Sequence, residues 1–270
     1  MKTFKIVIYL FSIFAITSCT KVIELKLGNN TGELVIEGNV TNATGPQIIK
    51  LSTNVPFSNT NTYPPVTGAS VSVSDQNGNT YPFTEGPSGT YSNSQLTGSS
   101  GNKYTMTVTS GGKTYTATSV MPAVVNLDSL SSMNDVIQTS DNKKVVTVYY
   151  QDPADVTNQY RFVLYVNSVQ VDDIYAYNDQ FNNGRYVGID LRENTGGSSV
   201  DKGIFSGDTV TVEMQCIDQP IYTYWETLMQ EQANGPGGSV TPSNPPSNIS
   251  PVTLGYFSAH TTQSKTIMVK

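Results

Sequence analysis

The sequence is poor in the residues that build metal centres. It has 270 residues but a single histidine, His260, and only two cysteines, Cys19 and Cys216. A metal site with two or more histidine ligands is therefore impossible within one chain. The segment beginning at Asp75-Gln76-Asn77-Gly78 resembles a calcium loop, but its twelfth position is Gly86 rather than the glutamate such a loop needs. We expect no metal ion and no cofactor.

Motifs for catalysis are also missing. The sequence has no G-x-S-x-G, H-E-x-x-H, Walker A or G-x-G-x-x-G run. A hydrolase triad would have to use His260, which lies between two predicted strands and which we interpret as a surface or turn residue. Asp172 and Asp173 are adjacent in a predicted strand, so their side chains point to opposite faces. We expect a non-enzyme without catalytic residues; a glycosidase pair assembled from distant strands is the alternative.

Charged residues are few, and acidic residues outnumber basic ones. Only 13% of residues are charged, and the formal net charge is −6. Nucleic-acid binding needs a basic footprint, so this composition argues against a nucleic-acid partner. Ser, Thr, Asn, Gly and Tyr take the place of charged residues, a mixture that favours strands joined by tight turns.

The first nineteen residues have the organisation of a bacterial export signal. Lys2 and Lys5 precede an almost wholly apolar run, residues 6–16, and Thr17-Ser18-Cys19 follows at once. The run is shorter than the roughly 20 residues that a spanning helix needs. An aliphatic residue, two small residues and a cysteine resemble the lipobox of bacterial lipoproteins. That resemblance implies cleavage before Cys19 and lipid on its thiol and amino group; an ordinary signal peptide with a chance cysteine is the competing interpretation.

Lipid on Cys19 would determine the anchor and the redox state of the mature chain. More than one acyl chain gives stable membrane attachment, at about 0.8 kcal/mol for each buried CH₂. Loss of residues 1–18 removes two lysines and no acid, which takes the net charge from −6 to −8. Cys216 would then be the only thiol, with no disulfide partner. It alternates with Val212 and Met214, which predicts a buried structural thiol.

Short alternating segments separated by turn residues predict a mainly β fold. The clearest hairpins join residues 68–74 to 80–83 through Asp75-Gln76-Asn77-Gly78, and 103–109 to 113–119 through Gly111-Gly112. Further strands are expected at 22–27, 33–40, 48–51, 145–150, 160–166, 171–177, 185–191, 209–217, 252–259 and 265–269. Turns are expected at 196–199 and 206–208.

One segment has helical periodicity. Ile221, Tyr224, Trp225, Leu228 and Met229 share one face of a helix predicted over 220–233. Asp218 is the predicted N-cap, and Asn234-Gly235 is the predicted stop. We interpret Trp225 as packing on the sheet rather than binding a ligand.

These elements predict five regions. Residues 1–18 are the signal peptide, 19–32 the lipid anchor and a short tether strand, and 33–122 an Ig-like or transthyretin-like β-sandwich. Residues 123–144 are polar and are interpreted as an irregular connector. Residues 145–270 form a second β-rich domain that carries the helix and a Gly/Pro-rich loop, 234–251.

Several short motifs, in their order along the chain, resemble one family. They are Gly38-Asn39-Val40, Val66-Thr67-Gly68-Ala69-Ser70-Val71, Asp75-Gln76-Asn77-Gly78, Gly89-Thr90-Tyr91, Gly101-Asn102-Lys103-Tyr104, Met121-Pro122, Pro220-Ile221-Tyr222-Thr223-Tyr224-Trp225, Asn244-Pro245-Pro246-Ser247-Asn248-Ile249 and Leu254-Gly255-Tyr256-Phe257. The chain resembles the Bacteroidota lipoproteins called domain of unknown function 4249. The resemblance implies an outer-membrane lipoprotein beside a TonB-dependent receptor, and the N-terminal domain is similar to carboxypeptidase-regulatory-like sandwiches.

Together these features favour a lipid-anchored, non-catalytic binding or accessory protein that acts in nutrient capture, on the outward rather than the periplasmic face of the membrane. Loops carry function on such scaffolds. The candidate partner surfaces are residues 54–65, with Tyr63, Pro64 and Pro65, and 234–251, with Asn244 and Pro245. The alternative is a structural or adhesion protein of the envelope without a small ligand.

Overall fold

A computed structural model describes residues 31–56, 62–137, 142–193, 203–233 and 244–270. This part of the chain is mainly β and sandwich-like, as the sequence predicts. The tether strand expected at 22–27, Cys19, the turn at 196–199 and the predicted helix stop at Asn234-Gly235 lie outside the described residues.

The N-terminal half forms a sandwich around its own core. Its strands are β1 (Leu34–Thr41), β2 (Gln47–Thr53), β3 (Ser70–Asp75), β4 (Thr80–Glu85), β5 (Thr90–Asn93), β6 (Lys103–Ser110), β7 (Lys113–Val120) and β15 (Ile249–Ser250). They are hydrogen-bonded in the order β1-β2-β5-β4-β3-β6-β7-β15. Strand β4 pairs with β3 through residues 80–83 and with β5 through 84–85, so the sheet folds over at β4 and encloses Ile36, Val73, Tyr91 and Met106.

The C-terminal half forms a second sandwich. Its strands are β8 (Leu127–Asn134), β9 (Lys144–Gln151), β10 (Gln159–Val166), β11 (Val169–Gln170), β12 (Tyr175–Asn178), β13 (Tyr186–Leu191) and β14 (Thr209–Ile217). A three-stranded sheet, β13-β9-β8, faces the sheet that contains β10 and β14. Tyr150 of the first sheet lies 4.7 Å from Tyr160 and 6.0 Å from Phe162 of the second, between ring centroids.

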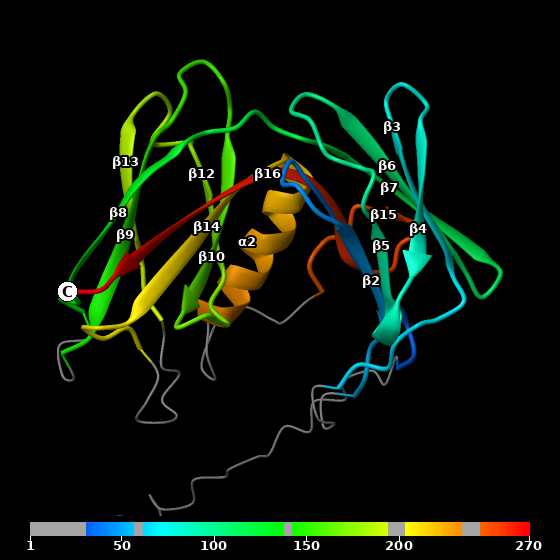
Figure 1. The fold of residues 1–270 in the computed structure, drawn as a ribbon, viewed down its shortest axis with the longest axis horizontal. Helices are drawn as coiled ribbons and strands as arrows, with labels where there is room; N and C mark the ends of the chain where they lie inside the picture. Colours follow the sequence, from blue (N-terminus) through cyan, green and yellow to red (C-terminus); the bar gives the residue numbers. More distant parts are fainter. Residues whose placement is uncertain (1–30, 57–61, 138–141, 194–202, 234–243) are drawn as a thin grey trace, which may run out of the picture. The chain divides into compact units, whose positions relative to one another are not determined.

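One long strand joins the two sandwiches. Strand β16 (Leu254–Met268) pairs with β1 in parallel through residues 254–260 and with β14 in antiparallel through residues 261–268. Figure 1 shows it as a single ribbon that runs from one sandwich into the other. Phe257 and Ala259 belong to the N-terminal core, whereas Val269, just beyond the strand, belongs to the C-terminal core.

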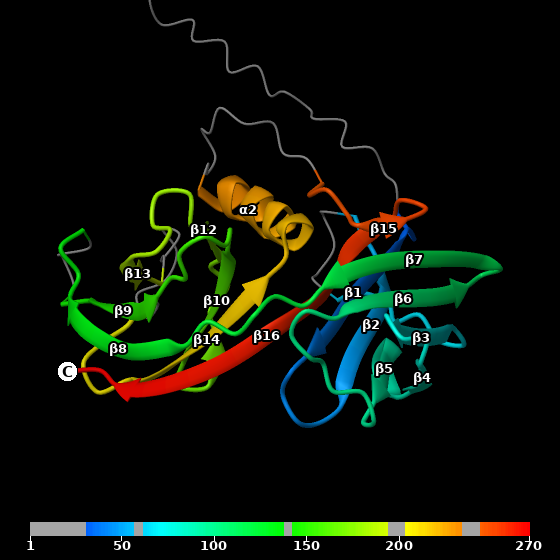
Figure 2. The ribbon, with the colours of Figure 1, turned by 90° about the horizontal axis from the view of Figure 1, so that it is seen from above.

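The predicted helix is present as α2 (Gln219–Ala233). It begins directly after β14 and packs against β10, β12 and β16, on one face of the sheet (Figures 1 and 2). Asp218 is its N-cap, because its Oδ1 accepts the backbone N–H of Ile221 at 3.3 Å. Its Oδ2 accepts from Ser119 Oγ at 2.7 Å and so ties the helix to β7. Within the described residues no helix has the length and apolarity needed to cross a bilayer.

Several predictions of strands and loops differ from the structure. Residues 123–144 are not an irregular connector, because they contain β8, which pairs with β9 and has a bulge between Leu127 and Ser129. Of the strand expected at 171–177, only residues 175–177 are in a strand, β12; residues 171–174, with Asp172 and Asp173, lie outside any strand. The two closing strands expected at 252–259 and 265–269 are one strand, and residues 249–250 of the predicted loop form β15.

Candidate functional site

A hollow lies on the sheet face that turns away from both cores. Side chains alternate between the two faces of a strand. In β1, Ile36 and Val40 enter the core, while Glu37 and Asn39 lie on the other face and line the hollow. In β10, Phe162 enters the core and Arg161 lines the hollow in the same way.

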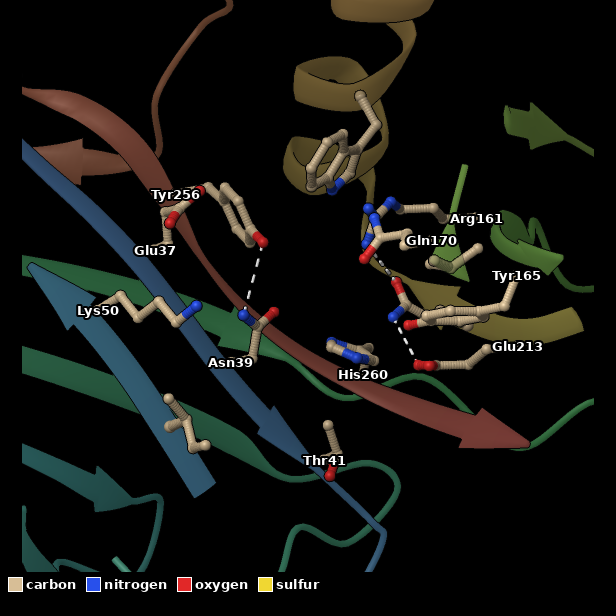
Figure 3. A pocket seen from close by; sticks show the side chains of 14 residues that line it. Glu37, Asn39, Thr41, Lys50, Arg161, Tyr165, Gln170, Glu213, Tyr256 and His260 are labelled. Carbon is tan, nitrogen blue, oxygen red and sulfur yellow. Dashed lines mark hydrogen bonds between the residues drawn. The ribbon is translucent and has the colours of Figure 1, made fainter. Parts of the chain in front are cut away.

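The hollow has a volume of about 400 Å³, and its floor crosses β10, β14, β16, β1 and β2. Its lining consists of the cations Arg161 and Lys50, the carboxylates Glu37 and Glu213, the amides Asn39, Gln170 and Gln215, the aromatics Tyr165, Trp225 and Tyr256, and His260 with Thr41, Ile48 and Val163. In Figure 3, Lys50 and Glu37 extend from one side, Arg161, Gln170 and Tyr165 from the other, and His260 lies between them. The volume is in the range of small-molecule sites.

Arg161 is held in position by neighbours that form no direct ion pair with it. Its guanidinium carbon lies 3.6 Å from the centre of the Trp225 ring, and its Nη1 donates to Gln215 Oε1 at 3.0 Å. Among the residues that the structure describes, no carboxylate forms a direct ion pair with Arg161. The charge of Glu213, which is hydrogen-bonded to Gln215, favours the protonated guanidinium from farther away. Burial lowers the pKa of Arg161, yet arginine stays charged because its ordinary pKa is so high.

A chain of hydrogen bonds fixes the orientation of Arg161. Gln215 Nε2 donates to Glu213 Oε1 at 2.8 Å, which leaves Gln215 Oε1 facing the guanidinium. Thr262 Oγ1 donates to the same Glu213 oxygen at 2.8 Å. Two neighbouring strands, β14 and β16, therefore position the arginine of a third, β10. If the Gln215 amide were flipped, its Nε2 donor would face the Nη1 donor of Arg161, so no hydrogen bond could form between them.

An aromatic cluster forms the wall beside Arg161. The Trp225 ring lies 5.2 Å from that of Tyr256, and the Tyr224 ring lies 5.0 Å from Tyr256, between centroids. Tyr256 is 6% exposed and its hydroxyl is 3.5 Å from Asn39 Nδ2. Trp225 therefore packs over the sheet, as the sequence indicates, but it also lines the hollow, which the sequence interpretation did not assign to it.

His260 lies in the middle of β16 and is only 2% exposed. The prediction of a surface or turn histidine is therefore wrong. Strand pairing changes from β1 to β14 directly after this residue, so His260 marks the junction of the two sandwiches. Burial lowers its pKa to about 3, with the charge of Arg161 as a second cause, and the imidazole is neutral at physiological pH.

Ser258 and His260 form the one pairing at this site that resembles a nucleophile and its base. Ser258 Oγ lies 3.0 Å from His260 Nδ1. An imidazole with a pKa near 3 is a weak general base at neutral pH. Ser258 itself is 1% exposed and does not line the hollow. The contact therefore has the properties of a structural hydrogen bond that holds the imidazole in place.

The remaining charges of the hollow lie on its N-terminal side. Glu37 and Lys50 are cross-strand neighbours in β1 and β2, and both are exposed. With Arg161 and Glu213, the lining carries two positive and two negative groups, so its formal charge is zero. The described residues contain no group of three His, Cys, Asp or Glu side chains arranged to hold a metal ion.

The structure places the candidate loop residues away from this hollow. Tyr63, Pro64, Pro65 and Asn244 are exposed, Pro245 is half-buried, and none of them lines it. Their role as a partner surface stays a prediction. Cys216 is 2% exposed, as predicted, and burial raises the pKa of its thiol.

Two sequence signals point to the residues that were missed. Arg161 is the only charged residue in the run Tyr160-Arg161-Phe162-Val163-Leu164. A charged side chain in such a strand is rarely buried without a partner, so it indicates an interaction or a functional role. Glu37, Asn39 and Thr41 alternate with core residues on β1. This alternation shows that the three side chains share one face of β1. It does not show which other strands lie beside β1, so it cannot predict the hollow.

A model of one protein family matches this chain over residues 20–266, a span that includes every residue of the hollow. The family is described as Domain of unknown function (DUF4249). A comparison with curated proteins found no match.

Proposed function

We propose that this chain, which belongs to the family Domain of unknown function (DUF4249), is a non-catalytic binding protein that holds a small polar molecule in the hollow beside Arg161. The observation that carries the proposal is the lining itself. Charged and amide groups from five strands converge beside an aromatic wall, and such convergence on a concave surface is typical of ligand sites.

The proposal includes a location. The sequence pattern of residues 6–19 supports a lipid anchor on Cys19 in the outer membrane, and the family resemblance supports a position beside a TonB-dependent receptor, facing outward. In that arrangement the protein would capture a nutrient that the receptor imports.

A thermal-shift screen tests the binding function. A ligand that binds only the folded protein stabilises it by about 2.7 kcal/mol at a hundred times its dissociation constant. We expect polar small molecules to raise the melting temperature of the purified protein. Ile48 is 38% exposed at the hollow, so Ile48→Phe should fill space there and abolish the shift. Val124→Phe, at a residue that is 44% exposed and does not line the hollow, is the control.

A shift that persists in Ile48→Phe would place binding elsewhere, and no shift with any compound would favour the structural or adhesion function.

The location of the protein is tested by a separate experiment. Labelled palmitate should be incorporated into the wild-type protein and not into Cys19→Ala, and a TonB-dependent receptor should co-purify with the labelled protein. Label on the variant would contradict the anchor, and loss of the receptor from the purified material would contradict the association.

A further inference from the structure

We infer that the ligand of this hollow carries a carboxylate, and that Arg161 binds it through the edge of the guanidinium. This inference rests on the proposed binding function and names the chemical class of the ligand. It starts from a half-buried cation that is fixed in place and that forms no direct ion pair among the described residues.

The stacking geometry decides which part of Arg161 is free. The guanidinium carbon lies over the Trp225 ring, 3.6 Å from its centroid. A guanidinium donates its five N–H groups in its own plane, so a ring against the face leaves the donating edge available. One N–H is used by Gln215. The others suit the two oxygens of a carboxylate, which accept a pair of parallel hydrogen bonds.

The charge of the lining favours a singly charged anion. Arg161 and Lys50 are offset by Glu37 and Glu213, so the hollow is formally neutral. A doubly charged phosphate would meet two carboxylates of the lining, and like charges at short range disfavour it. A monocarboxylate adds one negative charge next to Arg161. Its remaining atoms would lie along the aromatic wall of Trp225 and Tyr256.

The protein contains its own reporter for a test. Trp225 is the only tryptophan of the chain, and it contacts the guanidinium directly. Its fluorescence can be followed while the full mature protein is titrated with four compounds that share one ring: benzoate, benzamide, benzylamine and phenylphosphonate. We expect benzoate to change the emission saturably and to bind at least tenfold more tightly than the other three.

Arginine variants provide the second measurement. Arg161→Lys keeps the charge and loses the planar fork, and we expect it to weaken benzoate binding about tenfold or more. Arg185→Lys makes the same change at an exposed arginine that does not line the hollow, and should leave binding unchanged. Thermal unfolding of each variant shows whether it is folded.

The outcomes separate the inference from the function on which it rests. If benzamide, benzylamine or phenylphosphonate binds and benzoate does not, the carboxylate inference is wrong and the binding function stands. If none of the four changes the emission of the folded wild-type protein, the carboxylate inference is contradicted, whereas the binding function is contradicted only if the thermal-shift screen also finds no ligand. Equal benzoate binding by wild type and a folded Arg161→Lys would also overturn the role of Arg161. The comparison of head groups on the wild type remains decisive if Arg161→Lys does not fold.

Discussion

At the scale of single residues, burial acts on Arg161 and His260 in the same direction and with different results. Both side chains line one hollow, and burial lowers both pKa values because it disfavours the charged form. Arginine keeps its proton, since its ordinary pKa is far above neutrality. Histidine loses it. The hollow therefore combines a permanent cation with a neutral imidazole.

The neutral state of His260 predicts a pH dependence of stability. The unfolded chain has an ordinary histidine pKa near 6.5, whereas the folded value is about 3. Below pH 6.5 the unfolded state takes up the proton first, so His260 destabilises the fold as the pH falls. We expect the free energy of unfolding of wild type to drop relative to His260→Gln by about 2 kcal/mol at pH 5. Denaturant unfolding of both proteins from pH 4 to 8 measures this, and parallel pH profiles would contradict it.

The thiols offer a test of burial and lipidation together. Cys216 is buried and its thiol pKa is raised, so it should not react with a thiol reagent in the native protein. In denaturant, mature protein extracted from membranes should show one reactive thiol per chain, because Cys19 would carry lipid. Protein made without the signal peptide provides the comparison. Two reactive thiols in the membrane-derived protein would exclude a thioether on Cys19.

At the scale of elements, the sequence predicts a strand correctly where apolar and polar residues alternate along it without interruption. Strand β14 coincides with its predicted range, 209–217, and the helix starts within one residue of its prediction. Strand β8 was missed because a bulge after Leu127 breaks the alternation and serines fill its outer face. Strand β16 was divided in two because its sequence changes from aromatic to polar near His260, where its pairing partner changes.

Gly255 sets the path of β16 beside the hollow. Its φ is +94°, and a Cβ there would lie 2.0 Å from the backbone oxygen of Ile36. Gly207 has nearly the same φ, +95°, but open space around it. We expect Gly207→Ala to cost about 1–2 kcal/mol for its backbone conformation alone. Gly255→Ala should cost clearly more and shift the neighbouring Tyr256. Chemical denaturation compares the two, and equal losses would show that the close approach to β1 is not limiting.

The N-cap of α2 connects the helix to the N-terminal sandwich. Asp218 accepts from the first turn of α2 and from Ser119, and Ser119 Oγ in turn accepts the backbone N–H of Ala259 at 2.8 Å. Removal of a capping side chain typically costs about 0.5–2 kcal/mol. We expect Asp218→Ala to fall at the upper end of that range, because it also leaves Ser119 without its acceptor. The exposed Asp128→Ala serves as the control in thermal unfolding. Equal melting temperatures for the two variants would contradict this role.

At the scale of the whole molecule, the hollow exists because β16 belongs to two sandwiches. Its first half aligns with β1 and β2, which bring Glu37 and Lys50, and its second half aligns with β14, which brings Glu213 and Gln215. Each sandwich could be predicted from alternation and turns. Their junction could not, because a parallel pairing between residues some 220 positions apart leaves no local signal.

Native mass spectrometry of the protein purified from the cells that produce it shows whether the hollow binds a small molecule. We expect a small-molecule adduct on the wild-type chain that is retained by Arg185→Lys and lost or strongly reduced in folded Arg161→Lys. The adduct's mass would also identify the ligand. A wild-type chain that carries no adduct after growth in rich medium, or an adduct that both variants retain equally, would contradict ligand binding in the hollow.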